Sequence, residues 1–416
     1  MIALATGKSC GDIFAPYDAN RKIVRVMFTE SRLRGFERIL TTEVHVSDLL
    51  QELTDRDPMP WGDIIDMVPI AAHREHSFSK LKGEKRIQGS IDLLLESSDG
   101  DEVAIEVKVA HQFPENQRIR YESSTDGALV MIGMAGDQML VDSYPRWTFR
   151  ALADVFAAWS ESSNQVAALL ARIAAETLRR WDGIIDSVFR PATGAAKLDS
   201  LQEKFLAILV SRRLEHDLSK CGWHSRATVS KGSSGLALVQ GFAALNGDED
   251  RCLIAEARWV EGLRQINFRL GIDFSLDETR DTRAEAWILA KEMTDAIRIE
   301  AFQRHLGHAR PDLMKLVTFR GAGGRNTPND DVWLPVVERG LKDSSNIDGV
   351  PGPKGVQGTR QNVNPGFVGD GTLRFEASGQ IKSVAVDAVD LLDLIDEALK
   401  YLCSELPDGY SAGSLV

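Results

Sequence analysis

Cysteine is scarce in this chain of 416 residues, and its distribution excludes two kinds of site. The cysteines Cys10, Cys221, Cys252 and Cys403 lie far apart and form no C-x-x-C pair. Zinc sites and disulfide frameworks both require a recognisable cysteine spacing, so neither is supported here. We expect buried, reduced thiols and therefore a cytoplasmic protein.

Long apolar runs and a basic excess are also missing. No stretch approaches the roughly 18 apolar residues of a membrane helix, and residues 1–8 lack the charged start and apolar core of a secretory signal. We therefore expect no membrane partner. The formal net charge of −12 argues against a protein that coats nucleic acid. A nucleic acid can still be a substrate, because a cleaving enzyme needs only a local basic path.

The composition is typical of a globular protein with more than one domain. Hydrophobic residues make up 43% of the chain and charged residues 26%, which is ordinary for a folded protein. The length exceeds that of one common domain. The alternation of helical and strand-like segments predicts the α/β class. We expect an α/β domain over residues 1–146, a helical linker region over 147–220 and an α+β domain over 221–416.

Residues 89–109 predict a β-hairpin. Two strand-like runs flank a turn with Asp99-Gly100 at its centre, and Asp-Gly is a strong turn signal. Side chains alternate along a strand, so Glu106 and Lys108 share one face. The opposite, apolar face is formed by Val103, Ile105, Val107 and Val109. A Glu–Lys pair on an apolar strand is costly without partners, and a divalent cation and a phosphate would supply them.

This pattern predicts metal-dependent phosphodiester chemistry. Asp92 and Glu106 would bind Mg²⁺ or Mn²⁺ through oxygen, with the carbonyl of Val107 as a further ligand. The metal would lower the pKa of bound water. Lys108 would position or deprotonate the attacking water and stabilise the transition state.

A helix after Pro114 would complete the site. Gln117 and Tyr121 are four residues apart, so they lie on one face of that helix and can hydrogen-bond the site and the substrate. The alternative is an ordinary strand with a surface Glu–Lys pair, followed by an ordinary helix.

A basic segment precedes the hairpin, from His73 to Arg86. Such a segment is either solvated surface or a strip that contacts phosphates. The candidate nucleic-acid-binding residues are Lys82, Lys85, Arg86 and Arg120.

Together these residues resemble the PD-(D/E)XK nuclease superfamily. The resemblance rests on Asp92, on Glu106-Val-Lys108 and on Gln117-x-x-x-Tyr121, which matches the Q-x-x-x-Y motif of the RecB-like branch. It covers about residues 30–135, and Ile91 stands where the motif has proline. The segment from Phe36 to Glu43 is similar to the first helix of such nucleases, where a glutamate often joins the metal site. This implies Glu37 as a further ligand, with Glu43 as the alternative.

The resemblance implies a restriction-endonuclease-like αβββαβ core with a mixed central sheet. It also implies a magnesium-dependent endonuclease that cuts DNA rather than RNA, with a role as a prokaryotic anti-phage or restriction-like effector. Residues 221–416 would then recognise the substrate or regulate the nuclease. The chain could also assemble with copies of itself or with partner defence proteins. The alternative is a catalytically inactive nuclease-fold sensor or binding protein in a defence or repair complex.

A second Glu-x-basic pair occurs at Glu256-Ala-Arg258. Either this pair belongs to a degenerate second copy of the same fold, or it matches the first pair by chance. Elsewhere, the pattern predicts a strand or an approach to a strand at 64–71 and helices at 147–159, 166–189, 198–218, 277–307 and 387–405.

Overall fold

The computed structural model describes residues 30–82, 85–109, 113–190, 196–201, 203–229, 236–260, 262–275, 280–319, 334, 337–338, 366–368 and 372–413. The chain divides into two compact units, Met1–Arg179 and Arg180–Val416. None of the helices in the described ranges is both long and apolar enough to cross a lipid bilayer.

The first unit contains a mixed sheet with five strands in the order β1-β2-β3-β4-β5. The strands are β1 (Ala71–Lys82), β2 (Lys85–Glu96), β3 (Glu102–Val107), β4 (Ala128–Gly133) and β5 (Trp147–Ala151). β1, β2 and β3 pair antiparallel, whereas β3, β4 and β5 pair parallel. The predicted hairpin is therefore confirmed as β2 and β3, and the predicted α/β class with a mixed sheet is confirmed.

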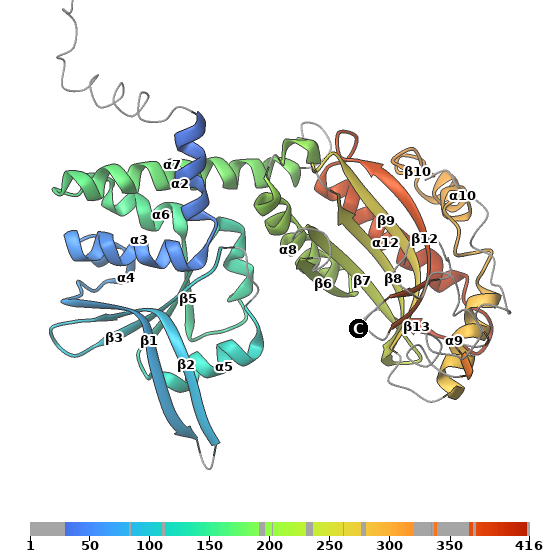
Figure 1. Cartoon of the computed structure of the whole chain (residues 1–416), viewed down its shortest axis with the longest axis horizontal. Coiled ribbons are helices and arrows are strands. Elements are labelled where there is room, and N and C mark those ends of the chain that lie inside the picture. The colour runs from blue at the N-terminus through green and yellow to red at the C-terminus, as the bar shows by residue number, and fades with distance from the viewer. Residues whose placement is uncertain are drawn as a thin grey trace, which may run out of the picture. The chain divides into compact units, whose positions relative to one another are not determined.

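Helices lie on both sides of this sheet (Figure 1). The α-helices are α2 (Glu30–Leu40), α3 (Glu43–Arg56), α4 (Trp61–Ile65), α5 (Glu115–Ser124), α6 (Leu152–Ala158) and α7 (Gln165–Val188), with short 3-10 helices η1 (Ala135–Leu140) and η2 (Trp159–Glu161). α3 contacts β1, β2 and β3, and α6 contacts β4 and β5. α5 contacts β1 and β2 from the other side. The order α3-α4-β1-β2-β3-α5-β4 places α5 between the two parallel strands β3 and β4 in the chain.

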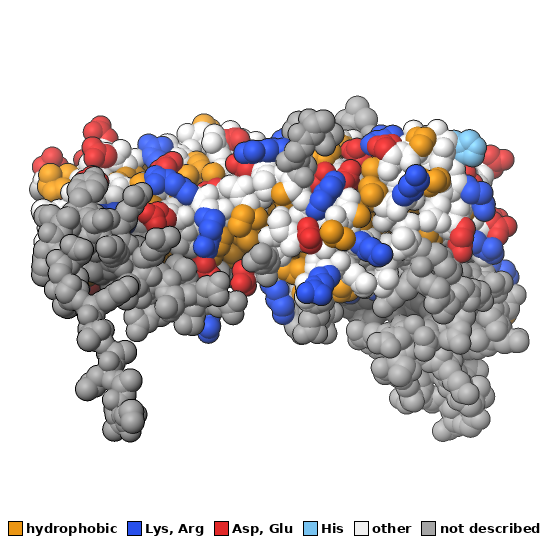
Figure 2. Space-filling view, turned by 90° about the horizontal axis from the view of Figure 1, so that it is seen from above, with side chains coloured by type: hydrophobic (Ala, Val, Ile, Leu, Met, Phe, Trp, Pro, Cys, Tyr) orange, Lys and Arg blue, Asp and Glu red, His pale blue; other side chains and the backbone are white. Residues whose placement is uncertain are grey.

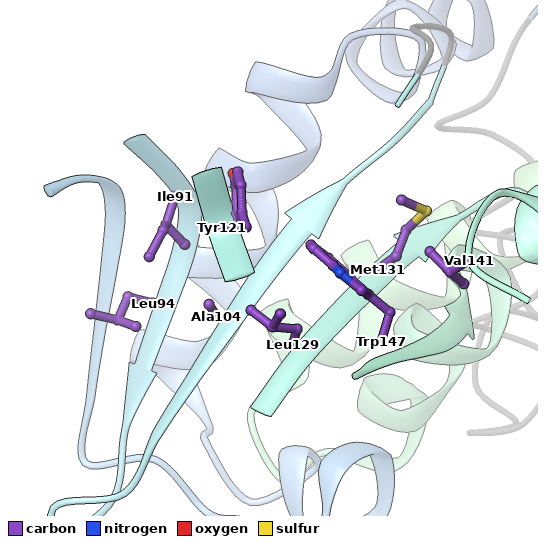
Figure 3. Close-up of a cluster of buried hydrophobic side chains, with 8 residues drawn as sticks. All are labelled: Ile91, Leu94, Ala104, Tyr121, Leu129, Met131, Val141 and Trp147. Carbon is purple, nitrogen blue, oxygen red and sulfur yellow. The ribbon is translucent and has the colours of Figure 1, made fainter. Parts of the chain in front are cut away.

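Strand alternation determines which side chains each face buries. Val103, Ile105, Val107 and Val109 are all buried, as expected from the sequence. The face that includes Glu106 packs a second apolar cluster, which is drawn in Figure 3: Ile91, Leu94, Ala104, Tyr121, Leu129, Met131, Val141 and Trp147. Tyr121 therefore anchors α5 in the core, and this fixes the position of Gln117 one helical turn earlier.

Two local predictions in this unit need correction. Residues 64–71, predicted as a strand or an approach to a strand, include the end of α4 (Trp61–Ile65) and then lead into β1, which begins at Ala71. Trp61 and Ile64 are both buried, which is the spacing of one helix face rather than of a strand. The expected helix at 147–159 begins as strand β5, because Trp147–Ala151 pairs with β4. Short apolar segments fit either structure until a neighbouring strand supplies backbone partners.

The second unit contains an eight-stranded sheet in which every pairing is antiparallel. Its strands are β6 (His224–Val229), β7 (Ala237–Leu245), β8 (Asp248–Trp259), β9 (Gln265–Ser275), β10 (Val317–Phe319), β11 (Gly366–Val368), β12 (Thr372–Lys382) and β13 (Ala412–Gly413). Asn246 and Gly247 join β7 to β8 with positive φ angles of 52° and 78°, as a tight hairpin turn requires.

Helices α8 (Lys204–Lys220) and α12 (Ala388–Ser404) cover one face of this sheet. A Cβ atom on Gly241 would lie 2.8 Å from Leu399 of α12, so glycine permits the close approach of that helix. The predicted helix at 387–405 is confirmed as α12, which buries Leu391, Ile395, Leu399 and Leu402. The expected helix at 277–307 is instead two helices, α9 (Arg280–Glu292) and α10 (Ile299–Ala309), because the backbone of Arg298 is extended.

Candidate active site

The predicted hairpin and the helix after it bring five of the predicted side chains together. Asp92 lies on β2, Glu106 on β3 and Lys108 just beyond the end of β3. Gln117 and Tyr121 reach the same place from α5. Because α5 links two parallel neighbouring strands, it returns the chain past the end of β3 and carries both side chains back to the hairpin.

Glu106 is the centre of this arrangement, and its two carboxylate oxygens differ. Its Oε1 is 2.6 Å from the ammonium nitrogen of Lys108 and accepts a hydrogen bond of 2.6 Å from Gln117 Nε2. Its Oε2 is buried and has no hydrogen-bond partner. The whole residue is 0% exposed. A buried carboxylate oxygen without a partner is costly, so this atom is where an additional cationic group would be stabilised most.

Asp92 is held beside Glu106 by the backbone of β3. Its Oδ2 accepts a hydrogen bond of 2.9 Å from the amide of Val107. Desolvation by burial, and then the negative charge of Glu106, raise the pKa of Asp92 to about 7. Two carboxylates that oppose each other's ionisation are a common feature of a cation site.

A bend in the hairpin releases the backbone of Asp92. The ladder pairs Arg74 with Leu93 and His76 with Ile91 but passes over the intervening pair, Glu75 and Asp92. Glu75 has a φ of 50°, which is uncommon for any residue except glycine. The amide of Asp92 instead donates to the hydroxyl of Tyr121, at 3.3 Å. Burial, then the charges of Glu106 and Asp92, raise the pKa of Tyr121, so this hydroxyl stays protonated.

A glutamate from the first helices also reaches the site. Glu43 is the first residue of α3; its Oε1 accepts a hydrogen bond of 3.1 Å from the amide of Val109, and its Oε2 is 3.8 Å from Lys108 Nζ. The resemblance implied Glu43 only as the alternative to Glu37. Glu37 lies on α2 and is half-buried, and its role as a ligand stays a prediction.

Metal ligation is only partly provided by the described side chains. Within the described ranges, no group of three or more His, Cys, Asp or Glu side chains has the geometry of a metal site. Asp92 and Glu106 supply two carboxylates, and the expected contribution of the Val107 carbonyl stays a prediction. Mg²⁺ commonly keeps several waters and takes one or two carboxylates plus substrate phosphate. The unpartnered Oε2 of Glu106 therefore fits such an ion, with Asp92 as the second ligand.

A cavity of about 610 Å³ opens beside the carboxylates. Residues of β1, β2 and α5 line it, including Gln117, Tyr121 and Arg120. Arg120 is exposed, and its Nε donates to the carbonyl of Asn116 at 3.2 Å. Of the predicted nucleic-acid-binding residues, only Arg120 has a described side chain. The side chains of Lys82, Lys85 and Arg86 lie outside the described residues, although their backbones pair within β1 and β2.

The second Glu-x-basic pair occupies a different setting. Glu256 and Arg258 lie on β8, whose neighbours β7 and β9 are both antiparallel, whereas β3 has one parallel neighbour. The two sheets therefore differ in topology, and the pair does not repeat the first site.

Glu256 is instead part of a buried ion network that the sequence reasoning missed. It accepts a hydrogen bond of 2.5 Å from Gln240 Nε2 and is paired with Arg258 at 3.1 Å and Arg374 at 3.2 Å. Arg374 also pairs with Asp273. Burial alone would raise the pKa of Glu256, but neighbouring arginines hold it below its ordinary value. Gln240, Asp273 and Arg374 are distant from Glu256 in the sequence, and strand pairing brings them together.

Comparison with known proteins adds no assignment. No family model matches the chain, and neither the curated proteins nor the solved structures give a match.

Proposed function

We propose that this protein is a metal-dependent nuclease that hydrolyses DNA phosphodiester bonds. The observation that carries the proposal is Glu106. Its buried Oε2 has no hydrogen-bond partner, while Lys108 and Gln117 both contact Oε1. A cation held between this oxygen and Asp92 would supply the partner that Oε2 lacks.

Asp92 and the Oε2 atom of Glu106 would hold a Mg²⁺ or Mn²⁺ ion. When bound, the ion would supply charge neutralisation for the phosphate and a lowered pKa for a bound water. Hydrolysis adds hydroxide to the phosphorus and a proton to the departing sugar oxygen. Lys108 is positioned by Glu106 and Glu43, so its ammonium can orient the attacking water and stabilise negative charge on the phosphate.

Gln117 and Tyr121 position the carboxylates in this proposal. Gln117 fixes the Oε1 atom of Glu106. Tyr121 holds the backbone of Asp92. Apart from the short helix α4 between α3 and β1, the order α3-β1-β2-β3-α5-β4 also agrees with the αβββαβ order expected of a PD-(D/E)XK core, which supports the proposal without identifying the family.

The surface is consistent with a local rather than a bulk attraction for DNA. In Figure 2, basic and acidic side chains are interspersed over the described part of the visible face. With a net charge of −12, the protein would rely on groups close to the site, such as Arg120. An anti-phage or restriction-like role, with the second unit as the recognising or regulating part, remains a proposal from resemblance alone.

A catalytically inactive sensor is the second candidate. It is favoured by the absence, in the described ranges, of a cluster with three potential metal ligands. Calorimetric titration with Mn²⁺ separates the two functions. A nuclease site takes up Mn²⁺ in a manner that depends on Asp92 and Glu106, whereas a scaffold shows no such dependence.

The direct test is cleavage of plasmid, linear and single-stranded DNA with Mg²⁺ or Mn²⁺. We expect cleavage by the parent protein and its loss in Asp92→Asn and Lys108→Met. Glu102→Gln is the control, because Glu102 is an exposed carboxylate on β3 and its substitution should leave cleavage unchanged. Thermal unfolding of each variant verifies that it is folded. The proposal fails if no substrate is cut, or if the Asp92 and Lys108 variants cut like the parent.

A further inference from the structure

We propose that the cavity between the β1–β2 hairpin and α5 holds one unpaired nucleotide next to the bond to be cut. The protein would therefore bind single-stranded DNA, or frayed ends, more tightly than a fully paired duplex. This inference rests on the proposed nuclease function, because it assigns the substrate form to the same site.

The size and position of the cavity suit a nucleotide. Its volume of about 610 Å³ lies within the range of small-molecule pockets, about 300–1,000 Å³. Gln117 and Tyr121 belong both to its lining and to the carboxylate site. A group bound in the cavity would thus lie one side chain away from Glu106 and Asp92.

The charge of the lining suits a phosphate backbone. None of the nine described lining residues carries a carboxylate, and the guanidinium of Arg120 is exposed at the cavity. The described lining therefore adds no negative charge beside the two carboxylates of the site, and this lowers the repulsion of an anion in a protein with a net charge of −12. Arginine also forms charge-assisted hydrogen bonds to phosphate.

Phe78 supplies an aromatic surface. Its ring lies against Gly89, its partner across the two strands, so closely that a Cβ atom on Gly89 would be 2.6 Å from the ring. The centroid of the Phe78 ring is 6.5 Å from the centroid of the Tyr121 ring, and the two rings meet edge to face. Phe78 is only half-buried and lines the cavity. An aromatic ring held in this way can stack on an unpaired base, whereas the bases of a continuous duplex already stack on one another.

The polar lining favours no particular base. Ser77, Ser90 and Gln88 each lie at the cavity and expose groups that both donate and accept hydrogen bonds. Such side chains can contact the edges of different bases. We therefore infer recognition of an unstacked nucleotide rather than of a sequence.

The test is fluorescence anisotropy in EDTA, where binding is measured without divalent metal. The probes are a labelled single-stranded oligonucleotide of mixed sequence and the same sequence as a blunt duplex. We expect tighter binding of the single strand. Phe78→Ala should weaken single-strand binding about tenfold, the effect of losing one base–aromatic stack, and should leave duplex binding nearly unchanged. Ile119→Ala is the matched control, because Ile119 is an exposed apolar side chain on α5 that does not line the cavity.

The outcomes separate this inference from the proposed function. Equal or tighter binding of the blunt duplex, no binding of either probe, or a Phe78→Ala variant that binds like Ile119→Ala would overturn the inference. If the protein gives any of those binding results and still cleaves DNA, the proposed nuclease function stands and only the nucleotide cavity is rejected. Single-strand binding that depends on Phe78 without cleavage under any metal would support the nucleotide cavity and overturn hydrolysis.

Discussion

Glu75 lies directly opposite Asp92 in the β1–β2 hairpin, and the hydrogen-bonded ladder passes over this pair. The left-handed backbone of Glu75, with φ 50°, bends the hairpin there. The amide of Asp92 is thereby free to contact Tyr121. An unfavourable conformation at a position that faces a candidate catalytic carboxylate suggests that the bend helps to place it.

Substitution of Glu75 tests the cost of this bend. Glu75→Gly should increase the free energy of unfolding relative to Glu75→Ala by about 1 kcal/mol, because glycine adopts positive φ without steric penalty. Both variants remove the same ion pair with Arg74, so the comparison isolates the backbone. Urea denaturation provides the measurement. Equal stabilities of the two variants would show that the bend carries no strain.

The pKa of Asp92 predicts how stability depends on pH. The folded pKa of about 7 lies above the ordinary value of 3.8, so the folded state binds a proton more tightly than the unfolded state. Ionisation of Asp92 therefore opposes folding, and stability falls as pH rises from about 4 to 7. Asp92→Asn should raise the melting temperature at pH 8 but not at pH 4. The exposed Asp63 supplies the control, since Asp63→Asn should show no such contrast.

Lys108 and Glu106 should be strongly coupled, because both are buried and 2.6 Å apart. Lys108→Met should reduce the free energy of unfolding by about 3 kcal/mol, since it leaves a buried carboxylate without its cation. The double variant Glu106→Gln/Lys108→Met should be more stable than Lys108→Met alone. A double-mutant cycle in denaturant measures this coupling, and simple additivity would contradict it.

The ion network of the second unit should give the opposite pH dependence to Asp92. The pKa of Glu256 is held below its ordinary value, so its contribution is present near neutral pH and is lost as pH falls through the acidic range. Arg374→Met should lower the free energy of unfolding by about 3 kcal/mol at pH 7, with a smaller loss at pH 3.

The exposed Arg264 provides a control for this network. Arg264→Met should change stability by no more than about 0.5 kcal/mol. Chemical denaturation of both variants at the two pH values tests the prediction. A loss for Arg374→Met that does not depend on pH would contradict the assignment to Glu256.

The sequence by itself determined the hairpin and the composition of the candidate site. Alternation placed Glu106 and Lys108 on one face of a strand, and the spacing of Gln117 and Tyr121 placed both on one face of a helix. Both placements follow from the periods of a strand and a helix, which can be read from the spacing of residues in the sequence. The α/β class followed from the same patterns.

Only the tertiary structure decided the features that depend on distant partners. The choice of Glu43 as a neighbour of Lys108, the strand at Trp147–Ala151 and the ion network around Glu256 all require contacts between segments far apart in the chain. The bend at Glu75 was equally invisible, because glutamate carries no signal for a positive φ. Local pattern specifies which face a side chain occupies, but packing and strand pairing specify what that face meets.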